Sequence, residues 1–267
     1  MCLYTKTIVN KRYVPTKKNG WGVNMDKCTD MRKLYVPYGC GKCIECVTQR
    51  RNSWIIRLTE ELKEHKNSYF VTLTFDDKSL SALYKDADEK HANGVATLAV
   101  RRFCERWRKK YRKSVRHWLI TELGDERGRI HLHGILFTDV DIETIRKIWK
   151  YGFIRVGEYC NEQSIGYITK YMLKGASESH VDFKQKILTS PAMGRNYLKS
   201  ENAKRHVYKK GEKIEPYKDA RGFERSLPLY YRNKLLTDAE KDEAFTDWLD
   251  REEISIMGTT FDISSGS

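Results

Sequence analysis

Two stretches rich in apolar residues, 116–124 and 129–137, are separated by four polar or glycine residues, DERG. So short a connection, polar and containing glycine, predicts a tight turn and therefore an antiparallel hairpin. In an extended strand the side chains alternate between the two faces, so His131 and His133 lie on one face and Leu132 on the other. Any fold of this chain must therefore accommodate two imidazoles on one face of a β-sheet.

The periodicity of the apolar residues predicts further helices and strands around this hairpin. Helical spacing is found at 45–66, 95–113, 141–152 and 161–176, and alternation at 68–75 and 153–159. From residue 68 onward the order is strand, helix, strand, strand, helix, strand, helix. This order predicts an α+β fold of the ferredoxin-like type, an antiparallel sheet with helices packed against one face.

Three segments are expected along the chain. Residues 1–66 hold a Cys-containing N-terminal segment, irregular up to residue 40 and ending in a helix; residues 67–180 hold the α+β core. Residues 181–267 form a basic C-terminal extension that ends in a short acidic helix at 237–253. No apolar run reaches the roughly 20 residues of a membrane helix, and the first residues lack the apolar core of a signal peptide. We therefore expect a cytoplasmic protein without a membrane partner.

The balance of charges predicts a polyanionic partner. The chain holds 50 Lys and Arg against 36 Asp and Glu, a formal net charge of +14. Residues 101–116 alone contain nine basic side chains and one acid, which is typical of a nucleic-acid surface, although a solvated helix face would also account for it. Aromatic residues among these charges favour single strands, whose bases stack on rings. The candidate DNA-binding residues are Arg101, Arg102, Arg108, Lys109, Arg112 and Arg195.

A carboxylate accompanies the two histidines. Glu122 lies on the preceding strand, and counting back from the turn brings it opposite the region of His131 and His133. One carboxylate and two neutral imidazoles make a three-ligand site for a divalent metal, with positions left for substrate oxygens. Mg²⁺ or Mn²⁺ suits this donor set because a phosphate supplies further hard oxygens, and Zn²⁺ remains an alternative. Two histidines on a wet sheet face would be the structural alternative.

The segment YITKY, residues 167–171, carries two tyrosines four residues apart. On a helix Tyr167 and Tyr171 share one face, about 6 Å apart along the axis, and Lys170 borders that face. An aromatic pair that docks the helix on the sheet has the same spacing. The chemical interpretation is that either hydroxyl attacks a metal-bound phosphorus, which requires stabilisation of the phenolate because a phenol has a pKa of about 10.

Together these motifs resemble the HUH endonucleases. ITELGDERGRIHLHGILF is similar to their metal motif, YITKY to the two-tyrosine form of their nucleophile motif, and FVTLTF to the first conserved strand. With MCLY, GCGKCIEC and LPLYY, the chain from Met1 to about Tyr231 resembles the replication initiators of the gokushovirus-like Microviridae. Ile130 departs from the proline that such proteins commonly have before the first histidine.

The resemblance implies a function and its residues. It implies nicking of the phage origin, attachment to the 5′ end, rolling-circle replication and religation of the displaced strand, with the host replication machinery as partner in the host bacterial cytoplasm. Carried over, Glu122, His131 and His133 would be the metal ligands. Tyr167 and Tyr171 would be the alternating nucleophiles, with Lys170 as their electrostatic partner.

The cysteines indicate a second metal site. In a cytoplasmic chain they are expected to be reduced, so metal binding is more plausible than disulfide formation. Cys40 and Cys43 have the spacing of a zinc knuckle, Cys46 adds a third thiolate, and Cys2 or Cys28 would complete a tetrahedral set for a structural zinc. Small buried residues at the start of a helix are the structural alternative.

Two other functions also fit the sequence. A basic, zinc-stabilised protein that binds single-stranded nucleic acid without catalysis explains the charge and the cysteines, but it leaves the Glu, His and Tyr pattern unexplained. A relaxase or single-strand transposase would use the same chemistry on another substrate. A nicking assay with Mn²⁺ separates the first of these from a nuclease.

Overall fold

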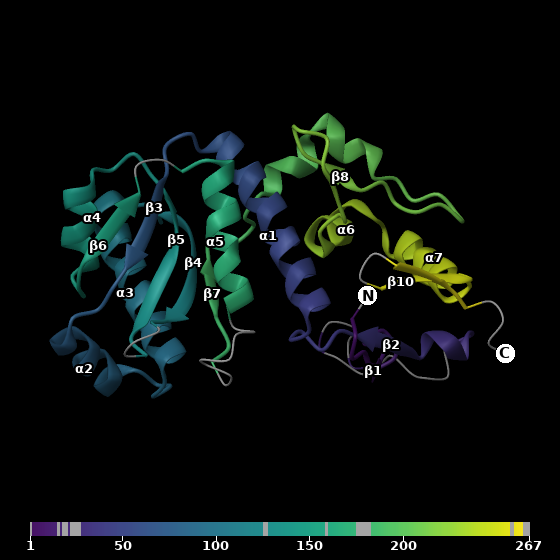
Figure 1. Cartoon of the computed structure of the whole chain (residues 1–267), viewed down its shortest axis with the longest axis horizontal. Coiled ribbons are helices and arrows are strands. Elements are labelled where there is room, and N and C mark those ends of the chain that lie inside the picture. Colours follow the sequence, from purple (N-terminus) through teal and green to yellow (C-terminus); the bar gives the residue numbers. More distant parts are fainter. Residues whose placement is uncertain are drawn as a thin grey trace. The chain divides into compact units, whose positions relative to one another are not determined.

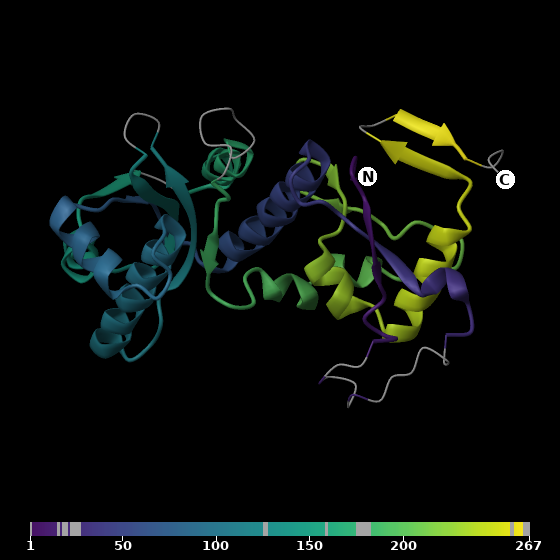
Figure 2. The ribbon, with the colours of Figure 1, turned by 90° about the horizontal axis from the view of Figure 1, so that it is seen from below.

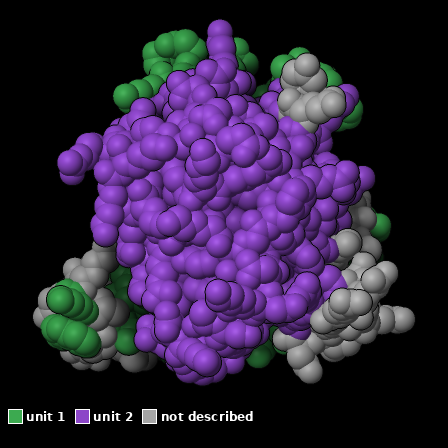
Figure 3. All heavy atoms as spheres, turned by 90° about the vertical axis from the view of Figure 1, so that its left-hand side faces the viewer, with its two compact units in different colours: residues 1–53, 198–267 green, residues 54–197 purple. Residues whose placement is uncertain are grey.

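The computed structural model of the chain describes residues 2–14, 17, 21, 28–124, 128–157, 160–174, 183–256 and 259–263. The chain divides into two compact units, coloured in Figure 3. Residues 54–197 form the first, called here the sheet unit, and residues 1–53 with 198–267 form the second, the terminal unit. The division into three segments expected from the sequence stays a prediction.

A five-stranded antiparallel sheet lies at the centre of the sheet unit. Its strands are β3 (Tyr69–Leu73), β4 (Arg116–Leu123), β5 (Ile130–Phe137), β6 (Ile154–Gly157) and β7 (Ile187–Thr189). They follow one another across the sheet in the order β6-β3-β5-β4-β7, and every neighbouring pair is antiparallel (Figure 1). The predicted antiparallel sheet and the β4–β5 hairpin are confirmed, while the turn at 125–127 lies outside the described residues.

Strand β7 was not predicted. It pairs with β4 through Ile187, Leu188 and Thr189, and it comes from the segment expected to be a basic extension. Three residues are too few to show an alternating period. The strand forms because the exposed edge of β4 offers unpaired backbone groups, which is a non-local cause.

One face of the sheet is closed by three helices: α2 (Asp77–Asp86), α3 (Ala92–Tyr111) and α4 (Ile142–Trp149). This closed face holds the alternate strand residues Val71, Leu73, Leu119, Leu132 and Leu136, all fully buried. Helices α3 and α4 contribute Phe103, Trp107, Ile145 and Trp149 to the same core. The register of the strands therefore directs every second side chain into one apolar layer.

The opposite face, called here the site face, is covered in part by two other helices. These are α5 (Glu162–Lys174) and residues 54–64 of α1 (Ile44–Glu64), which Figures 1 and 2 show on the other side of the sheet from α3 and α4. Trp118, Ile120 and Ile135 pack there against Leu58 of α1 and Ile168 of α5. The prediction of helices against one face was therefore wrong. Periodicity identifies a helix but not the face of the sheet that it covers.

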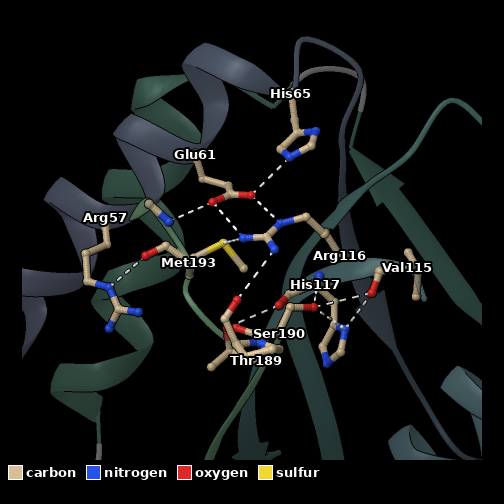
Figure 4. Close-up of polar contacts among 11 residues, drawn as sticks. Arg57, Glu61, His65, Val115, Arg116, His117, Thr189, Ser190 and Met193 are labelled. Atoms are coloured by element: carbon tan, nitrogen blue, oxygen red, sulfur yellow. Dashed lines mark hydrogen bonds and ion pairs between the residues drawn. The ribbon is translucent and has the colours of Figure 1, made fainter. Parts of the chain in front are cut away.

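A buried carboxylate fixes α1 to the site face (Figure 4). Glu61 is 1% exposed and accepts hydrogen bonds from the guanidinium of Arg116 on β4, one of them at 2.9 Å. It also accepts one from the backbone N–H of Gly194 at 2.6 Å, and His65 Nε2 lies 3.1 Å from its other oxygen. These charge-assisted hydrogen bonds compensate the cost of burying the carboxylate.

The terminal unit is built from both ends of the sequence. It contains β1 (Lys6–Val9), β2 (Tyr35–Tyr38), β8 (Tyr217–Lys218), β9 (Glu224–Arg225), α6 (Leu229–Leu235), α7 (Asp238–Leu249), β10 (Glu253–Ile256), β11 (Thr259–Asp262), two 3-10 helices at Met31–Lys33 and Glu201–Arg205, and the end of a third at Arg195–Lys199. Asp242 of α7 forms ion pairs with Arg12 and, at 2.8 Å, with Lys33. The acidic helix is therefore held by basic residues near the N-terminus.

Two sequence predictions about the terminal unit were wrong. The N-terminal segment is not irregular throughout, because β1 and β2 pair in antiparallel register. The acidic helix ends at Leu249 rather than 253, and the following residues form β10, which pairs with β11. Both errors concern strands that depend on a partner elsewhere in the chain. No helix among the described residues is long and apolar enough to span a membrane.

Candidate active site and cysteine cluster

The β4–β5 register places the predicted acidic residue beside the histidines. Glu122 lies opposite His131, and its Oε2 is 2.7 Å from Nε2 of His133 on the same face. The Glu122 side chain is 11% exposed and that of His133 12%, so the contact is largely shielded from solvent. The strand period thus brings the carboxylate and both imidazoles together on the site face.

Thr72 of β3 holds His133 from the other side. The two residues are paired in register, and Thr72 Oγ1 lies 3.0 Å from His133 Nδ1. With Nδ1 engaged by the threonine, Nε2 is directed toward Glu122, which is the arrangement typical of a metal-ligating histidine. Sequence reasoning missed Thr72, although the alternation in FVTLTF could have placed it on the face of the histidines.

His131 lies next to Gly124 at the end of β4. Its ring centroid is 6.5 Å from that of His133, and a Cβ built on Gly124 would lie 3.0 Å from its Cε1. Burial, with the charge of His133, lowers the pKa of His131 below its usual value. The imidazole is therefore neutral at physiological pH, which is the form that binds metal.

These donors fit a divalent metal. One carboxylate oxygen and one imidazole nitrogen already face each other at 2.7 Å, a separation that matches two ligands on one ion. His131 is the third donor, and its ring must turn toward the pair because the two imidazoles are 6.5 Å apart. The set leaves coordination positions free for oxygens of a substrate.

Helix α5 carries Tyr171 onto the same cluster. Its ring stacks on His133 with a centroid distance of 4.1 Å and an interplanar angle of 7°. Its hydroxyl donates a hydrogen bond of 3.1 Å to the hydroxyl of Tyr167. Burial, the hydrogen bond with Tyr167 and the charge of Glu122 raise the pKa of Tyr171 well above its usual value. Tyr171 therefore stays protonated and acts as a donor.

Tyr167 is the more accessible of the two tyrosines. It is 53% exposed, and its ring contacts Phe70 edge-on at 5.9 Å and Tyr171 at 5.6 Å. Lys170 is exposed on the same helix, one residue before Tyr171. The charge of Arg155 on β6 lowers the pKa of Tyr171, against the larger raising effects, and sequence reasoning did not single this arginine out. The cluster thus joins residues of β3, β4, β5 and α5.

The predicted DNA-binding arginines of α3 are not part of this cluster. Helix α3 covers the closed face, so the sheet separates its basic side chains from the tyrosines. Arg102 forms an ion pair of 2.8 Å with Asp86, and Arg101 lies 3.9 Å from Glu105. Arg108, Lys109, Arg112 and Arg195 are exposed. Their role in DNA binding stays a prediction.

Four cysteines gather in the terminal unit, at the start of α1. The Sγ atoms of Cys2, Cys40, Cys43 and Cys46 lie within 4.8 Å of one another, and they could hold a metal ion. Cys28 is elsewhere, with its Sγ 3.0 Å from the carbonyl of Asp30. Of the two fourth ligands left open by the sequence, the structure therefore brings Cys2 into the set.

Backbone donors prepare these sulfurs for a cation. Cys40 N–H donates to Cys2 Sγ and Cys43 N–H to Cys40 Sγ, each at 3.2 Å. A hydrogen bond from the backbone of Cys46 lowers the pKa of Cys43 to about 6. Gly41, between the first two knuckle cysteines, has φ +73°, which favours glycine. This geometry matches the turn of a thiolate metal knuckle.

Comparisons with known proteins give the chain its relatives. Two curated relatives are the replication-associated protein ORF4 of Chlamydia phage 1, 24% identical over 250 residues, and the replication-associated protein VP4 of Bdellovibrio phage phiMH2K, 24% identical over 229 residues. The alignments cover 83% and 73% of this chain, but only 59% and 66% of the relatives. The chain thus spans roughly three fifths to two thirds of these relatives.

No solved structure matches the chain at the same level of significance. The family model of the replication-associated protein ORF2 matches residues 68–176, from the residue before β3 to just beyond α5. This segment contains all the residues of the Glu122, His133 and Tyr171 cluster. The resemblance to phage replication initiators predicted from the sequence is therefore confirmed, and residues 68–176 match the ORF2 family of replication-associated proteins.

Proposed function

We propose that this chain initiates rolling-circle replication by nicking single-stranded phage origin DNA through a tyrosine. The observation that carries the proposal is the contact of Tyr171 with His133, which puts two phenolic hydroxyls beside the Glu122–His133 pair. The strand order β6-β3-β5-β4 is that of a ferredoxin-like fold and supports membership in the HUH endonucleases. The proposed setting is the host bacterial cytoplasm, with the host replication machinery as partner.

The proposed step is a transesterification. The Oη of Tyr167 attacks the scissile phosphorus, an O–P bond forms to the tyrosine, and the bond from phosphorus to the 3′ oxygen breaks. The product is a 5′-phosphotyrosine, and the proton lost by the phenol is balanced by the one that the 3′ hydroxyl gains. Because one phosphodiester replaces another, attack by a 3′ hydroxyl on the phosphotyrosine later reseals the strand.

Tyr167 is the proposed first nucleophile because it is the exposed one and accepts the hydrogen bond of Tyr171. A donor held at 3.1 Å stabilises the negative charge that develops on the Tyr167 oxygen. After the first cleavage Tyr171, released from this role, is the second nucleophile within reach. Lys170 is the proposed electrostatic partner of the phosphate at the same helix surface.

Glu122, His131 and His133 would hold Mg²⁺ or Mn²⁺ in this proposal. When bound, the metal supplies charge that polarises the scissile phosphate. Thr72 keeps His133 oriented through the 3.0 Å contact at Nδ1, and Glu122 approaches from the neighbouring strand. The burial of this contact excludes water from the reacting phosphate.

Covalent trapping on a single-stranded origin oligonucleotide tests the assigned nucleophile. Tyr167→Phe should abolish the adduct and leave oligonucleotide binding intact. Tyr38→Phe is the matched control, because Tyr38 is 58% exposed and lies in the terminal unit. An adduct that persists in Tyr167→Phe would remove Tyr167 from the mechanism. Binding of single strands without any nick in Mn²⁺ by the unaltered protein would favour a non-catalytic binding protein.

We further propose that the cysteine cluster holds a structural Zn²⁺. The 3.7 Å between Cys43 Sγ and Cys2 Sγ is close to the edge of a tetrahedron with Zn–S bonds of about 2.3 Å. The purified chain should contain about one zinc ion, and Cys43→Ser should lose it while Cys28→Ser keeps it. A chain that is stable without metal and binds no added Zn²⁺ would contradict this assignment.

A further inference from the structure

An exposed aromatic side chain lies at the outer edge of the sheet. Phe153 precedes β6 directly and is 63% exposed. Strand β6 is the edge strand, and no other described strand pairs with its outer side. Burying a phenylalanine is worth about 1.5–3 kcal/mol, so folding alone gives no reason to leave this ring in water. Its exposure is understandable if a ligand covers it.

The register relates this edge to the candidate active site. Thr72 on β3 is paired with His133 on one side and with Arg155 of β6 on the other. Because neighbouring strands are about 4.8 Å apart, Arg155 begins roughly 10 Å from His133 in the same row of the sheet. The pairing continues past β6, since the backbone N–H of Thr74 donates to the carbonyl of Phe153 at 3.0 Å.

Cations accompany the exposed ring. The guanidinium of Arg146 lies 5.8 Å from the centroid of Phe153, at the outer limit of a cation–π contact. Arg155 is exposed two residues along the strand, and its positive charge is felt at Tyr171, which shows that it faces the tyrosines. An aromatic surface beside guanidinium groups matches one nucleotide step, in which a base stacks on the ring and a phosphate pairs with the arginine.

We propose that Phe153 and Arg155 form a binding site for the single strand next to the scissile phosphate. The Phe153 ring stacks a base, and Arg155 pairs with a phosphate between that base and Tyr167. The net charge of +14 favours a polyanion over a peptide or a lipid surface as the occupant. The location beside the scissile bond rests on the proposed function, whereas binding at this edge does not.

Binding of fluorescent oligonucleotides to the full chain tests the stacking step. With Tyr167→Phe as the parent protein, binding is measured without cleavage. Adding Phe153→Ala should weaken binding about tenfold, within the range of base–aromatic stacking, and Phe153→Trp should restore it. Phe223→Ala is the matched control, because Phe223 is 61% exposed in the terminal unit and Arg221 lies 5.9 Å from its ring centroid.

Oligonucleotides that lack a single base sharpen this test. At one abasic position the unaltered ring should lose its advantage, so that Phe153→Ala costs nothing further there. Arg155→Gln should lower the slope of log affinity against log salt concentration by about 0.7, the value for one phosphate contact on a single strand. Arg155→Lys should keep that slope.

The proposal is overturned if Phe153→Ala binds as tightly as Phe223→Ala, or if its loss is the same at every abasic position. It is equally overturned if Arg155→Gln leaves the salt slope unchanged. These outcomes differ from failure of the proposed function, which appears as an absent covalent adduct with the unaltered protein. Weakened binding of Phe153→Ala by a protein that never nicks would therefore retain the binding site and remove only its link to cleavage.

Discussion

The two faces of the five-stranded sheet use alternate residues of the same strands for different purposes. On β5, Leu132 is fully buried under α3 and α4, whereas His131 and His133, its direct neighbours, remain partly accessible on the site face. The closed face is an apolar layer, and the site face gathers Glu122, Thr72 and the tyrosines. A strand can therefore supply stability and chemistry at once, and substitutions should separate the two.

The largest effect is expected on the site face. Replacing His131 and His133 together by alanine should lower metal-dependent cleavage about 10³-fold, because the charge stabilisation of several kcal/mol that a metal supplies is lost. Stability should change by only about 1 kcal/mol, since neither side chain belongs to the apolar core. Cleavage kinetics and urea unfolding of the same preparation measure both. Cleavage that survives this change, or survives chelation, would break the comparison.

The converse effect is expected one residue away. Leu132→Ala on the closed face should reduce the free energy of unfolding by about 3 kcal/mol through the cavity it leaves. Cleavage per folded molecule should stay unchanged, because the side chain points away from the site. Chemical denaturation together with active-site titration by covalent trapping separates the two quantities. A loss of rate per folded molecule as large as that of the histidine variant would mean that the faces are not separable.

A smaller effect is expected for the second tyrosine. Tyr171→Phe removes the hydrogen bond to Tyr167 and should slow the first nick about tenfold, the value of one hydrogen bond to a charged oxygen. The covalent adduct should still form at Tyr167, and recircularisation should fail. Single-turnover rates on the origin strand, followed by a joining assay, test this. Complete loss of the first nick would exchange the roles of the tyrosines.

The smallest effect is a shift in pH dependence. Burial lowers the pKa of His131, so the imidazole is still neutral at pH values where an exposed histidine is already protonated. Protons should displace Mn²⁺ only as the pH falls below the usual histidine pKa of about 6.5. Titration of Mn²⁺ affinity against pH measures this limb. A limb above pH 6.5 would show that the site face does not shield His131.

The sequence predicts those parts of the site that depend on local period. Alternation in one strand puts His131 and His133 on one face, and a short turn brings Glu122 opposite them, as the register has it. Helical spacing puts Tyr167 and Tyr171 on one surface, and both hydroxyls are in contact. In each case neighbours in the chain determine the arrangement.

The remaining features depend on segments that are distant in the chain. Thr72 reaches His133, and Arg155 takes its place in the same row, only because β3 lies between β5 and β6. The pairing of β7 with β4 has the same non-local origin. The position of α5 on the site face likewise follows from packing against Trp118 and Ile135, not from its own sequence. Periodicity contains no information about such partners.

The most direct test of the central claim is the position of the covalent bond to DNA. Trypsin cuts after Arg155 and Lys170, so Tyr167 and Tyr171 fall on separate peptides, 156–170 and 171–174. After reaction with an origin strand and digestion of the DNA, mass spectrometry should find a nucleotide on Tyr167 of the first peptide. A nucleotide on neither tyrosine, from a protein that still cleaves, would contradict the proposed nucleophiles.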